Sequence, residues 1–135
     1  MATLKRIDHV VIATEDLQDA ARLWERNLGL KPDASLDRPL GSGFKVSRLP
    51  IGDAFLELVQ PVSDKGRFAE QFQERGEGMF SVSIEVDDLE GAVAYLRENG
   101  ARVSDPEPGI WPDSRVARIS RSSSHGVSIQ LIQRR

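Results

Sequence analysis

The sequence contains no cysteine, so disulfide bonds, thiolate metal sites and a cysteine nucleophile are all excluded. Long apolar runs are also missing, because no stretch approaches the ~20 apolar residues that a membrane-spanning helix needs. The opening Met1–Arg6 has no apolar run of signal-peptide length. A net charge of −3 with mixed signs argues against nucleic acid as the main partner. We therefore expect a soluble, cytoplasmic protein with no membrane or nucleic-acid partner.

The clearest positive feature is an internal repeat, since Ile7–Leu17 aligns without a gap with Met79–Leu89. Each copy reads as a strand that leads into apolar residues at helical spacing. An aspartate stands where a helix N-cap acceptor is needed, and a glycine stands where a left-handed residue ends a helix. The caps expected from this pattern are Asp16 and Gly29 in the first copy, and Asp88 and Gly100 in the second.

Three further extended segments follow the helix in each half, so the sequence predicts two tandem βαβββ modules. The weakest of the predicted strands lie near residues 31–37 and 101–104. The expected fold is α+β, with one curved, cleft-containing mixed sheet and the helices outside it. Residues 1–135 would form a single domain, in which module 1 spans about 5–62, a linker about 63–77 and module 2 about 78–133. The linker is expected to carry a short helix around Phe68–Arg75.

Side chains alternate along a strand, so parity assigns each residue to a face. One face is apolar and would support the helices. The opposite face mixes polar and apolar groups at matched positions in four strands, which suits a concave pocket. The polar-and-apolar face carries Ile7, His9, Val11, Phe55, Glu57, Val59, Met79, Ser81, Ser83, Ser128, Gln130 and Ile132.

Six short motifs stand in a fixed order along the chain: Ile7-Asp8-His9-Val10, Leu28-Gly29-Leu30, Leu49-Pro50-Ile51-Gly52-Asp53, Leu56-Glu57-Leu58, Arg75-Gly76-Glu77-Gly78 and Ile84-Glu85-Val86-Asp87-Asp88. In this order and spacing they resemble the vicinal oxygen chelate superfamily, which contains glyoxalase I, bleomycin-resistance proteins, extradiol dioxygenases and methylmalonyl-CoA epimerase. The similarity is greatest to the epimerase branch.

This resemblance implies a divalent metal held by four positions, which here are His9, Glu57, Ser81 and Gln130. Imidazole and carboxylate are ordinary ligands for Zn, Mn, Fe, Co or Ni, whereas an amide is a poor ligand and a serine hydroxyl a weak one. His9, Glu57 and Gln130 are therefore the predicted metal ligands and catalytic residues. A tight site normally has three firm protein ligands, and this chain offers two.

The epimerase chemistry implied by the resemblance also needs groups that move a proton. One expected glutamate falls on or near Leu40, and the other is replaced by Gln130, whose amide cannot act as a base. The alternative is a metal-free cavity whose polar residues hydrogen-bond one another or a ligand. In that case His9 is a core histidine bonded across the sheet, or an acid or base acting without metal, and Glu57 is a surface carboxylate or a partner of His9.

The predicted substrate pocket extends beyond these positions. Trp111 lies in a loop that could close over a ligand, although loop aromatics are often packed down. The predicted pocket residues are Ser81, Ser83, Phe55, Met79, Ser128 and Trp111. Five other residues are weaker candidates. Arg48, Arg115 and Arg118 could meet an anionic substrate but are expected to be solvated. Glu85 could be a replacement base or an exposed charge, and His125 is expected to be an exposed turn residue.

The leading hypothesis is an isomerase- or lyase-type enzyme acting on a small carbonyl or acyl-thioester substrate, with altered metal and base positions. The alternative is a metal-free protein that binds a small molecule, as bleomycin-resistance proteins do. A homodimer is expected, because the first strand of each module would otherwise leave an open edge.

Overall fold

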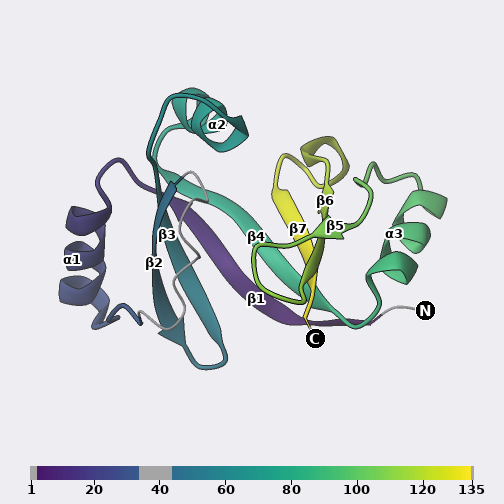
Figure 1. The fold of residues 1–135 in the computed structure, drawn as a ribbon, viewed down its shortest axis with the longest axis horizontal. Coiled ribbons are helices and arrows are strands. Elements are labelled where there is room, and N and C mark those ends of the chain that lie inside the picture. Colours follow the sequence, from purple (N-terminus) through teal and green to yellow (C-terminus); the bar gives the residue numbers. More distant parts are fainter. Residues whose placement is uncertain (1–2, 34–43, 135) are drawn as a thin grey trace. The chain divides into compact units, whose positions relative to one another are not determined.

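The computed structural model describes residues 3–33 and 44–134, and Figure 1 shows the order of their helices and strands. Each half of the chain begins with a strand and a helix and continues with further strands, and one short helix separates the two halves. The elements are β1 Leu4–Ala13, α1 Leu17–Leu28, β2 Phe44–Ile51, β3 Ala54–Pro61, α2 Arg67–Arg75, β4 Gly78–Val86, α3 Leu89–Glu98, β5 Glu107–Pro108, β6 Arg115–Ile119 and β7 Ser128–Gln133.

The seven strands form one sheet in the order β2-β3-β1-β4-β7-β6-β5. The sheet is mixed, because β4 and β7 run parallel while β2–β3, β5–β6 and β6–β7 are antiparallel. The predicted α+β class with a mixed sheet is thereby confirmed. The expected open edge at the first strand of each module is wrong, since β1 and β4 are internal and the edges are β2 and β5.

The two weak strands of the prediction have different outcomes. Residues 31–33 lie in no strand, and the rest of the segment near 31–37 is outside the described residues. In the second half, Val103 forms a single bridge with Ile119, and the next strand, β5, has two residues. Pro106 and Pro108 have no backbone N–H to donate, which limits how far this segment can pair.

The helix ends follow the local signals in the sequence. The side chain of Asp16 accepts a hydrogen bond from the Asp19 N–H at 3.1 Å, and that of Asp88 accepts from the Gly91 N–H at 3.1 Å. Gly29 ends α1 with φ at 71°, a left-handed conformation that glycine adopts without strain. The short helix expected between the two halves is also present, as α2.

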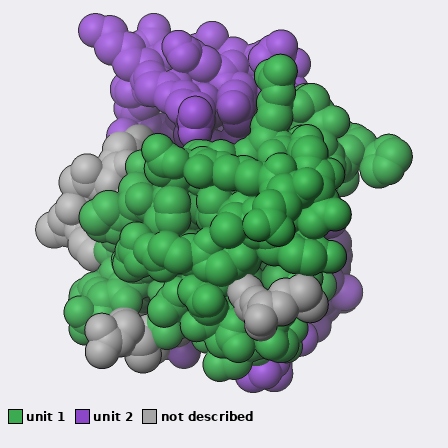
Figure 2. All heavy atoms as spheres, turned by 90° about the vertical axis from the view of Figure 1, so that its right-hand side faces the viewer, with its two compact units in different colours: residues 1–9, 81–135 green, residues 10–80 purple. Residues whose placement is uncertain are grey.

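The chain divides into two compact units, coloured separately in Figure 2: unit 1 is Met1–His9 with Ser81–Arg135, and unit 2 is Val10–Phe80. In unit 1, α3 packs its apolar face on strands β4, β6 and β7. Leu89 at its start is fully buried, and the helix is held by a cluster of apolar neighbours. The buried members of this core are Val86, Leu89, Ala92, Val93, Ala117 and Leu131.

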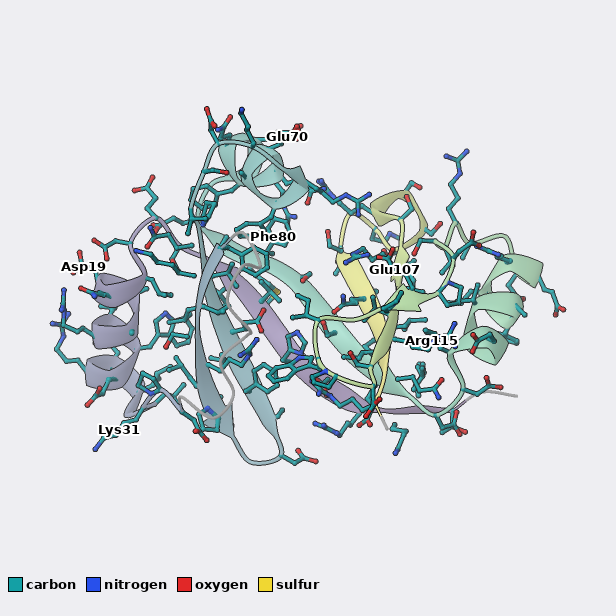
Figure 3. The ribbon with its side chains drawn as sticks, viewed as in Figure 1. Asp19, Lys31, Glu70, Phe80, Glu107 and Arg115 are labelled. Carbon is teal, nitrogen blue, oxygen red and sulfur yellow. The ribbon has the colours of Figure 1, made fainter. Side chains whose placement is uncertain are left out.

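Unit 2 contains the β2–β3 hairpin together with α1 and α2. The ring of Phe68 in α2 lies 4.8 Å from the ring of Phe80, labelled in Figure 3, and 5.7 Å from that of Phe44. These aromatic contacts attach α2 to the strands beside it. Of the described helices in either unit, none is long and apolar enough to cross a bilayer.

Candidate functional site

A buried polar cluster surrounds His9 in unit 1. The His9 ring is 3% exposed, and its Nδ1 lies 2.7 Å from Oδ2 of Asp8, which is 1% exposed. Arg134 donates two N–H hydrogen bonds to the same carboxylate, at 2.8 and 2.9 Å, although it lies 126 residues after Asp8 in the sequence. Arg6 adds a third cationic contact at 3.1 Å. His9 is therefore tied to a carboxylate that is itself held on several sides.

The charge of Asp8 decides which ring nitrogen of His9 donates to it. Burial acts to raise the pKa of Asp8, but the hydrogen bonds and charges of His9 and Arg134 outweigh it and hold that pKa well below the usual range. Asp8 is thus an ionised carboxylate, which can only accept hydrogen bonds. His9 must donate from Nδ1, so in the neutral ring Nε2 is the nitrogen with the lone pair.

The outer part of this cluster involves Trp111 and Glu85. The Arg134 guanidinium lies over the Trp111 ring at 5.1 Å, so the loop tryptophan is packed against a side chain that holds Asp8. Glu85 is 12% exposed and accepts from Nε of Arg6 at 2.9 Å, so the expectation of an exposed charge is wrong. Both residues support the cluster from outside.

Strands β4 and β7 place four of the other predicted residues side by side. Their register pairs Ser81 with Ser128 and Ser83 with Gln130. The Ser83 hydroxyl donates to the Gln130 amide oxygen at 2.9 Å, and Ser83 is fully buried. The oxygen that Gln130 would offer to a metal is therefore engaged by a hydroxyl.

Unit 2 contains a second buried cluster, built by the β2–β3 hairpin. Register sets Arg48 opposite Glu57, and Nε of Arg48 lies 2.8 Å from Oε2 of Glu57. Both side chains are 0% exposed, so the expectation that Arg48 is solvated is wrong. The Arg48 guanidinium also lies 5.7 Å from the ring centre of Phe55. A predicted ligand is thus paired with a cation that belongs to the chain.

The remaining candidates lie at the surface. Arg115 pairs with Glu90 and Arg118 with Glu107, and all four side chains are substantially exposed; Figure 3 labels Arg115 and Glu107. His125 is an exposed turn residue with φ at 54°, as expected.

The predicted pocket residue Met79 is 65% exposed. Leu40, where the resemblance places a catalytic glutamate, lies outside the described residues.

Comparison with known proteins identifies the family. Residues 8–117 match the family model described as "Glyoxalase/Bleomycin resistance protein/Dioxygenase superfamily". The matched range includes His9 of the first buried cluster and Glu57 of the second. The chain belongs to this superfamily. It is also 31% identical to the ethylmalonyl-CoA/methylmalonyl-CoA epimerase of Cereibacter sphaeroides, over 95% of this chain and 97% of that protein. The resemblance inferred from the motifs is confirmed.

Solved structures agree. A methylmalonyl-CoA epimerase from Mycobacterium tuberculosis is 25% identical and superposes with a TM-score of 0.83 over 98% of this chain and 89% of that one. Another methylmalonyl-CoA epimerase, solved in complex with methylmalonyl-CoA and NH4+, has the same fold at 24% identity, with a TM-score of 0.84 over 98% and 96% of the two chains.

The metal that the superfamily resemblance implies can be tested against the donors of this member. His9 suits a ligand, because metal-binding histidines usually donate their second N–H to a carboxylate, as His9 does to Asp8. Glu57 does not, because Arg48 already neutralises it. Across residues 3–33 and 44–134, no group of three His, Asp or Glu side chains could hold a metal ion. Of the two firm donors expected from the sequence, His9 therefore fits a metal ligand and Glu57 does not.

One hollow is found elsewhere in this superfamily member. It lies within unit 2, has a volume of about 580 Å³, and is bounded by the end of β1, by α1 with Trp24 and Arg26, and by Glu77 just before β4. None of the predicted site residues lines it, and both signs of charge surround it. The hollow gives no indication of a particular ligand.

Proposed function

We propose that this protein is an isomerase-type enzyme that moves a proton on a small acyl-CoA thioester. Similarity to methylmalonyl-CoA epimerases over nearly the whole chain supports the substrate class and reaction type. The observation that carries the proposal is the Asp8–His9 contact at 2.7 Å. It gives a buried imidazole with one nitrogen fixed as a donor and the other able to accept a proton, as a general base requires.

In this mechanism Nε2 of His9 removes the proton from the carbon next to the thioester carbonyl. The electron pair of that C–H bond forms a C=C bond, and the carbonyl pair moves onto oxygen to give an enolate. Asp8 favours this step because its negative charge stabilises the imidazolium that forms. A proton from solvent, delivered to the opposite face of the same carbon, restores the C–H bond with inverted configuration, and the His9 imidazolium then releases its proton to solvent, which completes the isomerisation. Asp8 and Arg134 are positioning residues, since they act through His9.

Exchange of the substrate proton with solvent tests the proposal. The protein is incubated with methylmalonyl-CoA in D2O, with and without a chelator, and deuterium next to the carbonyl is followed by NMR and mass spectrometry. We expect exchange that the chelator does not abolish, and a loss of about 10²-fold or more in His9→Gln.

His125→Gln is the matched control, because it removes the other histidine of the sequence, which lies in an exposed turn. It should exchange at the wild-type rate. Absence of exchange in the wild type, or full exchange in His9→Gln, would refute the assignment.

The second candidate is a metal-free protein that binds a small molecule without converting it. The Arg48–Glu57 ion pair favours it, because the pair neutralises a carboxylate that catalysis or metal binding would use. This function predicts thermal stabilisation by CoA thioesters without deuterium exchange. The homodimer remains a prediction, which sedimentation at micromolar concentration would check.

A further inference from the structure

We propose that the Arg48 guanidinium permanently replaces a divalent metal beside Glu57, so that this chain keeps a built-in cation where the superfamily resemblance implies a bound one. The inference holds for either function above, because it concerns what neutralises Glu57 and not which reaction follows.

The first support is geometric. Arg48 and Glu57 are directly opposed residues of antiparallel strands, so their side chains project to the same side of the hairpin. Their contact of 2.8 Å is that of a charge-assisted hydrogen bond. The hairpin backbone thus delivers the guanidinium to the carboxylate, and no rearrangement of the loop is needed to form the pair.

The second support is the environment of the pair. Both side chains are 0% exposed, and Phe55 and Val59, which share the strand face of Glu57, are buried apolar residues. A carboxylate in such surroundings needs a cation beside it. Arginine provides that cation at any physiological pH, because a guanidinium does not lose its proton in proteins.

The third support is competition between cations. A divalent ion bound to Glu57 would stand within a few ångströms of the guanidinium, and the repulsion between them would be strong in a poorly hydrated site. Binding a metal would therefore require Arg48 to give up its ion pair with this carboxylate, and breaking a buried ion pair is costly. The Glu57 carboxylate can therefore pair with Arg48 or bind a metal, but not both, and in the structure it pairs with Arg48.

Metal analysis of tag-free protein, purified without chelator, tests this replacement. We expect no stoichiometric Zn, Mn, Fe, Co or Ni in the wild type and the same result in Glu57→Gln. Added Co²⁺ should leave the Tm of both proteins unchanged. Stoichiometric metal in the wild type that Glu57→Gln removes would overturn the proposal.

Arg48→Ala tests the same position from the other side. Arg48→Ala removes the cation that lies 2.8 Å from Glu57, so Co²⁺ should bind this variant at least about tenfold more tightly than the wild type and raise its Tm. Arg48→Ala/Glu57→Gln should lose this gain, and Arg118→Ala, which removes an exposed paired arginine, should never show it. If Arg48→Ala does not respond to Co²⁺, Arg48 does not stand in for a metal. If that variant does not fold, the comparison of the wild type with Glu57→Gln still decides.

Discussion

Asp8→Asn removes one negative charge from a carboxylate that is 1% exposed and contacted by His9, Arg134 and Arg6. Removing one partner of a buried ion pair typically costs about 3–5 kcal/mol, because the other charge is left uncompensated. Here the two arginines are 26% and 31% exposed and regain part of their hydration, so we expect the lower end, about 3 kcal/mol. The free energy of unfolding should fall by this amount at neutral pH.

Urea unfolding followed by circular dichroism measures this change. Asp105→Asn is the matched control, because it makes the same substitution in unit 1 at an ion pair with Arg97 whose carboxylate is 88% exposed. That change should cost less than about 1 kcal/mol.

The pH dependence has a definite sign. The pKa of Asp8 is lowered in the folded protein, so its contribution is complete above the unfolded value of about 3.9 and is lost as the pH falls below it. The stability difference between wild type and Asp8→Asn should be constant near neutrality and should shrink below about pH 4.

The same variant changes His9 in a way that loss of packing would not. An ionised carboxylate accepts only, whereas an amide can either accept from Nδ1 or donate to it. Ring ¹⁵N spectra at alkaline pH should therefore show one neutral tautomer in the wild type, protonated at Nδ1, and a mixture in Asp8→Asn. Equal costs for Asp8→Asn and Asp105→Asn, or an unchanged tautomer, would refute the role given to Asp8.

Two further predictions concern the fold. Leu89→Ala removes a fully buried side chain from the core under α3 and should lower the free energy of unfolding in urea by about 2–5 kcal/mol. Tyr95→Ala, at a position of the same helix that is 49% exposed, should lower it by less than about 1 kcal/mol. Similar costs would mean that this core is not packed as described. Asp16→Ala should cost about 1 kcal/mol in the same assay because it removes the N-cap of α1, and an unchanged midpoint would show that the cap contributes nothing.

The parts of the fold that the sequence predicted are those set by local chemistry. Asp16 and Asp88 accept from backbone N–H groups three residues away, and such caps can be recognised without knowing the tertiary structure. The strand near 101–104 was less predictable, because whether a short extended segment pairs depends on its neighbours. Here it contributes one bridge, by Val103.

The buried clusters were harder to predict, for two different reasons. The contact between Asp8 and Arg134 joins residues 126 positions apart, and no local pattern announces it. The pair of Arg48 and Glu57 was within reach, because counting back from a two-residue loop at Gly52 and Asp53 sets them opposite each other. It was missed because charges on strands are usually solvated.

The Arg48–Glu57 pair also has a consequence for how the hairpin forms. A slip of one residue between β2 and β3 would set Arg48 opposite Leu56 or Leu58 and would turn one strand's side chains to the wrong face. Each charge would then be buried without its counterpart, at a cost of several kcal/mol. The ion pair therefore selects a single alignment of the two strands, and a misaligned hairpin is disfavoured wherever its charges become buried.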